Sequence, residues 1–98
     1  MIPALYAHLW LAMTKTANRS GYALALHGSM NRDLDVVAIP WTEDCDAPYE
    51  LIYKFAKRHD LLIASPIPEK KPYGRRAWLL LLRDSRHYID LSITPRLK

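Results

Sequence analysis

Two aspartates and a Gly-Ser turn are the strongest candidates for a reactive site in this chain. Gly28-Ser29 is followed, after three intervening residues, by Asp33 and Asp35 at alternate positions of an apolar segment. Alternate residues of a β-strand point to the same face, so the two carboxylates are predicted to lie side by side. Carboxylates this close repel unless a cation lies between them, and their hard oxygen atoms suit a magnesium ion that also binds phosphates. The backbone N–H groups of the turn can bind those phosphates.

A third acidic residue lies near the end of the chain. In the segment 88–94, apolar residues alternate with the polar residues Asp90, Ser92 and Thr94. This alternation predicts a strand with one buried face and with Asp90 on the opposite face.

The Gly28-Ser29 turn, the Asp33-x-Asp35 strand and the later Asp90 together resemble the signature of the DNA polymerase beta-like nucleotidyltransferase superfamily, in particular its minimal members. The resemblance implies transfer of a nucleoside monophosphate from an NTP to a hydroxyl acceptor, with metal ions stabilising the attacking and leaving oxygens. It implies that the three aspartates bind Mg²⁺ and that Asp90 also helps to activate the acceptor hydroxyl. The residues that it implies for nucleotide binding are Gly28, Ser29 and Arg32.

The phosphate-binding segment is shorter than is usual in that superfamily, because only residues 30–32 separate Ser29 from Asp33. A second domain that would hold an acceptor is also not apparent. The alternative function is therefore a catalytically degenerate binding module on the same fold, such as a phage-encoded regulator or inhibitor of a host protein. The chain is similar to small phage or prophage proteins that share a Gly-Ser, Arg-Asp-x-Asp, Pro-Trp pattern, which favours a bacterial host cell as its location.

The hydrophobic pattern predicts the elements that position these residues. The first half of the chain is predicted to form a helix over 3–17, with Gly21 as its C-terminal cap, and then strands over 22–26 and 34–39. The second half is predicted to form a helix that starts within 44–48 and ends near 59, a short strand or connection over 61–64, a loop over 65–74, and a hairpin of strands over 77–83 and 88–94. The apolar run 79–82 predicts a strand covered on both faces. The expected fold is α+β, a single domain over 1–98 with a mixed sheet and helices mainly on one face. The resemblance places the second strand beside the last, which would bring Asp90 near Asp33 and Asp35.

Composition limits the classes of protein that the chain can represent. Half of its 98 residues are hydrophobic, and its single cysteine excludes an internal disulfide, so we expect a cytoplasmic protein with no membrane span. The net charge is +4, with most of the excess in the last third. That charge suits a polyphosphate substrate, an acidic protein or a nucleic acid, although no nucleic-acid-binding motif is present and a solvated surface is the simplest interpretation.

Structural interpretations of the same residues stay open. Asp33 could close a turn, and Asp90 could be an ordinary residue of an exposed strand face. Arg75 and Arg76 could contact phosphates or be simply solvated. We expect Trp41 at the rim of a pocket, and for Cys45 no partner histidine is identifiable.

Overall fold

The computed structural model describes residues 2–28, 33–84 and 86–95. The elements in this part of the chain are α1 (Ile2–Arg19), β1 (Tyr22–His27), β2 (Leu34–Pro40), α2 (Pro48–Arg58), β3 (Leu62–Ile63), β4 (Glu69–Lys70), the short 3₁₀ turn η1 (Pro72–Gly74), β5 (Arg76–Leu81) and β6 (Tyr88–Ile93). In these described ranges, neither helix is long and apolar enough to cross a membrane.

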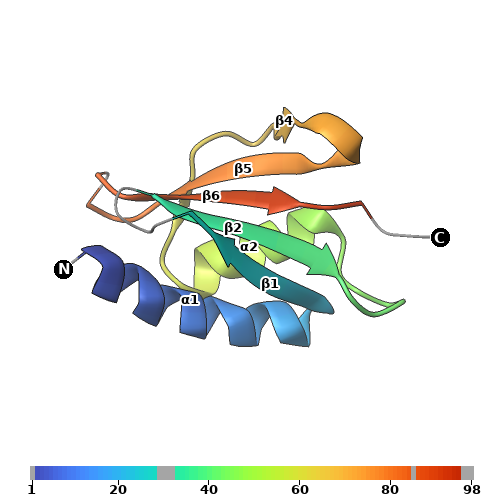
Figure 1. Ribbon diagram of the computed structural model, residues 1–98, viewed down its shortest axis with the longest axis horizontal. Helices are drawn as coiled ribbons and strands as arrows, with labels where there is room; N and C mark the ends of the chain where they lie inside the picture. The colour runs from blue at the N-terminus through green and yellow to red at the C-terminus, as the bar shows by residue number, and fades with distance from the viewer. Residues whose placement is uncertain (1, 29–32, 85, 96–98) are drawn as a thin grey trace.

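The strands form one mixed sheet in the order β1-β2-β6-β5-β3, and β4 pairs with the start of β5. Strands β2 and β6 are parallel, whereas the other pairs are antiparallel. Both helices pack on one side of the sheet: in Figure 1, α1 lies along the bottom and α2 lies behind β2 and β1, while the turn that follows β4 lies beyond β5 at the top. The predicted α+β fold, with helices mainly on one face, is therefore confirmed. The predicted position of the second strand beside the last is also confirmed.

The core lies between the helices and the sheet face that they cover. Strand β2 contributes alternate buried residues, Leu34, Val36 and Ala38, and β6 contributes Ile89 and Leu91. In the described part of the chain the helices bury six hydrophobic side chains against these strands, namely Tyr6, Met13, Ala17, Leu51, Ile52 and Phe55. Because strand side chains alternate, the residues between these buried positions lie on the opposite face, which we call the open face.

The structure differs from the prediction along β5 and the segment before it. The apolar run 79–82 was predicted to be covered on both faces, which is wrong because Leu79 is 39% exposed on the open face. Only one helical layer is present in the described structure, so an apolar side chain there lacks a second layer to cover it. The segment 65–74 was predicted to be a loop, but Glu69 and Lys70 pair with β5.

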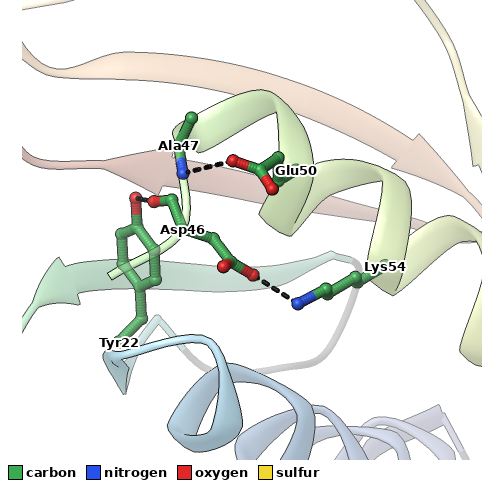
Figure 2. Close-up of polar contacts among 5 residues, drawn as sticks. All are labelled: Tyr22, Asp46, Ala47, Glu50 and Lys54. Atoms are coloured by element: carbon green, nitrogen blue, oxygen red, sulfur yellow. Dashed lines mark hydrogen bonds and ion pairs between the residues drawn. The ribbon is translucent and has the colours of Figure 1, made fainter. Parts of the chain in front are cut away.

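The start of α2 is fixed by a small group of polar contacts (Figure 2). Ala47 is the N-cap residue, and its backbone N–H donates to the Glu50 carboxylate at 3.1 Å. The Asp46 carboxylate accepts from the Lys54 amine at 2.5 Å, while the Asp46 carbonyl accepts from the Tyr22 hydroxyl at 2.7 Å. The bond from Tyr22 attaches the beginning of α2 to the beginning of β1.

Candidate active site

Asp35 and Asp90 are register partners on the parallel strands β2 and β6. Both are half-buried, and both lie on the open face because their strand neighbours are core residues. Adjacent strands are about 4.8 Å apart, so the two carboxylates share one patch of the sheet. Like charges at such positions are unfavourable unless a cation binds between them. Two of the three predicted acidic residues are therefore neighbours in the sheet, and their role as a site stays a prediction.

Gly28 lies directly against this pair. Its backbone has a φ of +80°, and a Cβ atom at position 28 would lie 2.7 Å from Oδ2 of Asp35. Glycine is thus required both by the backbone conformation and by the lack of space. The main chain at the end of β1 can therefore approach a ligand held by Asp35. The predicted nucleotide-binding residues Ser29 and Arg32 lie outside the described residues, and their role stays a prediction.

Asp33 occupies a different position from the pair. It directly precedes β2 and is half-buried. Burial raises the pKa of Tyr6 above 10.0, and the charge of Asp33 raises it further, so Asp33 lies near this residue of α1. The strand register places Asp90 beside Asp35. It does not show which way the Asp33 side chain points, because Asp33 lies outside the paired residues of β2. Metal binding by all three aspartates stays a prediction.

Two cations from the segment before β5 border the acidic pair. Arg75 donates from Nη1 to the hydroxyl of Ser92 at 3.4 Å, two residues beyond Asp90 on the same face of β6. The Lys71 amine lies 2.8 Å from a Glu69 carboxylate oxygen. The pKa of Lys71 is raised above 10.5, first by its hydrogen bond to Glu69 and that residue's charge, and then by the charge of Asp90. Two carboxylates and two cations thus occur on one surface.

A hollow of about 210 Å³ adjoins Asp90 on the open face. It is lined by Ser65, Ile67, Glu69, Ala77, Trp78, Leu79 and Asp90. Its walls are mixed, with apolar side chains beside the carboxylates of Glu69 and Asp90, so it can take a substrate that has both apolar and polar parts. A different hollow, of about 290 Å³, lies at the other end of β6, next to Pro40, Gly74 and Arg76, and contains none of the predicted site residues.

The residues of the open face fit a magnesium ion that a phosphate group also binds. Among the described residues, no group of three or more His, Cys, Asp or Glu side chains is placed to hold a metal ion. Mg²⁺ is usually bound through one or two carboxylates, with substrate phosphates and water completing its octahedron. Asp35 and Asp90 supply that number of carboxylates on one face, and Oδ2 of Asp35 packs against Gly28, where a Cβ atom would lie only 2.7 Å away.

Other candidate residues lie away from the pair or are buried. Trp41 is exposed, but it follows β2 at the end opposite Asp35, so it does not border the acidic pair. Cys45 is buried before α2, which gives a nucleophile no access to substrate. His27 is the register partner of Asp35 on β1, a position next to the pair.

The contribution of Lys71 was missed by the sequence analysis. The signal that could have indicated it is Pro72-Tyr73-Gly74, a turn sequence that folds the chain back so that the Lys71 N–H donates to the Arg75 carbonyl at 2.9 Å. This turn places Lys71 and Arg75 on the same side of the hairpin. For Arg75, the sequence left phosphate binding and simple solvation equally open, and the structure places it near Asp90.

No protein-family model matches the chain, and a search of curated proteins found no match. The function must therefore be argued from the residues of the site and their geometry.

Proposed function

We propose that the chain is a magnesium-dependent nucleotidyltransferase that transfers a nucleoside monophosphate from an NTP to a hydroxyl acceptor and releases pyrophosphate. The observation that carries this proposal is the pairing of Asp35 with Asp90 across two parallel strands, with the Gly28 backbone against Asp35. The neighbouring cations Lys71 and Arg75 support it, because a triphosphate needs positive charge beside the metal.

Each residue of the site has a role in this proposal. Asp35 and Asp90 would hold Mg²⁺ through carboxylate oxygens, and Asp33, just before β2, would add negative charge near them. When bound, the metal stabilises negative charge on the attacking and leaving oxygens. Lys71 and Arg75 contact the triphosphate and keep it in line for attack. Asp90 accepts the proton of the acceptor hydroxyl as that oxygen bonds to the α-phosphorus, and the bond to the β-phosphate breaks with its electron pair leaving on pyrophosphate.

The test is an equilibrium titration of the full chain with ATP, GTP, CTP and UTP, each in magnesium and in EDTA. We expect at least one NTP to bind in magnesium and to lose affinity in EDTA. Asp35→Asn should remove the binding, because an amide keeps the shape of the carboxylate but not its charge. Asp44→Asn is the matched control, since Asp44 is an exposed carboxylate in the loop after β2.

Two outcomes would contradict the proposal. One is that none of the four nucleotides binds in magnesium. The other is that Asp35→Asn and Asp44→Asn bind as well as the original chain, which would place the nucleotide elsewhere. If binding is observed, incubation with a radiolabelled NTP and candidate hydroxyl compounds then identifies the acceptor.

A second candidate function is a non-catalytic module that binds a protein, such as a phage-encoded regulator or inhibitor of a host protein. It is favoured by a hollow of about 180 Å³ beside Trp78, where the α2 residues Tyr49 and Tyr53 are 46% and 63% exposed. Exposed aromatic side chains around a hollow are typical of surfaces that bind proteins. Under this alternative no NTP binds, Asp35→Asn keeps biological activity, and Tyr53→Ala loses it.

A further inference from the structure

The turn between β4 and β5 holds an aromatic side chain away from the protein. Tyr73 is 93% exposed, and its backbone has a φ of 65° and a ψ of 29°, a left-handed conformation that costs energy for any residue with a Cβ atom. The backbone bonds between Lys71 and Arg75, and between Arg75 and Pro72, close the turn. In Figure 1 this turn lies at one end of the sheet, above β5. The closed turn thus fixes the backbone at Tyr73 and presents a ring that buries almost none of its surface.

The same hairpin concentrates positive charge. Residues 69–76 contain four Lys and Arg side chains and a single acid, Glu69. Glu69 pairs with Lys71, which leaves Lys70 and Arg76 as exposed register partners on β4 and β5. Like charges directly opposite each other destabilise a strand pair. An anion bound between Lys70 and Arg76 would remove that repulsion.

We propose that the hairpin of β4 and β5 binds single-stranded nucleic acid, with a base stacked on Tyr73 and phosphates contacted by Lys70 and Arg76. A flat exposed ring among cations matches a polymer that offers both a π-face and phosphates at each nucleotide. A double helix offers the phosphates but keeps its bases stacked on one another, so the ring favours a single strand. This inference goes beyond the proposed nucleotidyl transfer and does not require it.

A second feature of the same region suits this ligand. Arg76 and Gly74 also line the hollow of about 290 Å³ at the end of β6, where the remaining walls include Pro40, Pro48 and Pro95. Its volume is near the lower limit of small-molecule pockets, about 300 Å³. A base that leaves the stack next to Tyr73 can therefore enter an apolar space with a cation at its edge, as in other proteins that bind unpaired bases.

The test is fluorescence anisotropy of the full chain with labelled oligo(dT) and oligo(U) of 20 nucleotides, in EDTA and 50 mM KCl. We expect binding that weakens roughly 7- to 50-fold between 50 and 200 mM KCl, as two to four phosphate contacts require. Tyr73→Ala should weaken it by about fivefold or more, whereas Tyr73→Phe should keep it. The control Tyr53→Ala removes a different exposed ring, on α2, and should have no effect.

Charge is tested with two double variants. Lys70→Gln with Arg76→Gln should weaken binding and lower the slope of log affinity against log salt by about 1.4, whereas Lys57→Gln with Arg58→Gln on α2 should change neither. Asp35→Asn should bind the oligonucleotide normally, so this test is separate from the NTP titration.

Absence of binding at 50 mM KCl would overturn the proposal, as would equal affinity for duplex DNA. Tyr73-dependent binding to anionic vesicles but not to oligonucleotides would overturn it as well.

Discussion

A Cβ atom at position 28 would lie 2.7 Å from Oδ2 of Asp35, so Gly28 and Asp35 occupy adjoining space on the open face. Gly28→Ala should lower the free energy of unfolding by about 1–2 kcal/mol, because alanine is strained at a φ of +80°. It should also displace the Asp35 carboxylate, which on the proposed function weakens magnesium-dependent NTP binding by about tenfold to a hundredfold. Urea denaturation and the NTP titration measure the two effects.

Gly74→Ala is the matched control for this substitution. Gly74 also has a positive φ, of +77°, but its Cβ would meet Pro95 at 3.3 Å rather than an acidic residue. We expect a comparable loss of stability with NTP affinity retained. If Gly28→Ala were as stable as the original chain and bound NTP equally well, the close approach of Gly28 to Asp35 would have no functional meaning.

The two faces of the sheet should respond differently to loss of a leucine. Leu91 on β6 is fully buried under the helices, while Leu79 on the neighbouring strand β5 is 39% exposed. Leu91→Ala should lower the free energy of unfolding by about 2–5 kcal/mol, and Leu79→Ala by about 1 kcal/mol or less. Chemical denaturation of the two variants under the same conditions measures the difference. Equal losses would mean that the open face is covered as well.

Acid should weaken the attachment of α2. The pKa of Asp46 is held below 3.8, mainly by its hydrogen bond to the Lys54 amine, against a smaller effect of burial. Because the folded-state pKa is lowered, the stabilisation is fully present well above pH 3.8 and is lost as the pH falls through the folded-state value. Lys54→Met should therefore lower the urea midpoint at pH 7 more than at pH 2.5. An equal difference at both pH values would exclude this ion pair as the cause.

The contact between the helices should be sensitive to pH near neutrality. His59 Nε2 lies 2.8 Å from the Thr16 hydroxyl of α1, and burial, followed by the charge of Arg58, lowers the pKa of His59 below 6.5. As the pH falls, the His59 ring takes up a proton in the unfolded chain before it does so in the folded one. The stabilisation by the neutral His59 ring is therefore complete above pH 6.5 and declines toward the folded-state pKa. We expect Tm to fall between pH 7.5 and 5.

Two variants assign that pH dependence to a particular histidine. His59→Gln should be less dependent on pH across this range, because the buried titrating group is gone. His8→Gln, at an exposed position on α1, should keep the slope of the original chain. A slope that His59→Gln leaves intact would exclude His59 as its cause.

Much of the fold follows from local pattern. The spacing of apolar residues predicted both helices, and α1 runs from Ile2 to Arg19 where a helix over 3–17 was expected. Strand alternation predicted that Asp90 lies opposite Leu91, and the buried positions confirm it. The failure at Leu79 has a physical cause, since an apolar run shows that a strand is hydrophobic but not whether a second layer covers it.

Local alternation within a strand was enough to predict that Asp35 and Asp90 each lie on the face opposite the core, but it did not place Asp33, which lies just before β2. Only the tertiary structure decided that Asp35 lies beside Asp90 and that Lys71 and Arg75 lie near them. Parallel pairing joins segments more than fifty residues apart, and its register depends on how the whole chain packs into one core. No short stretch of sequence encodes that packing, so the acidic pair could be proposed from the chain but placed only by the fold.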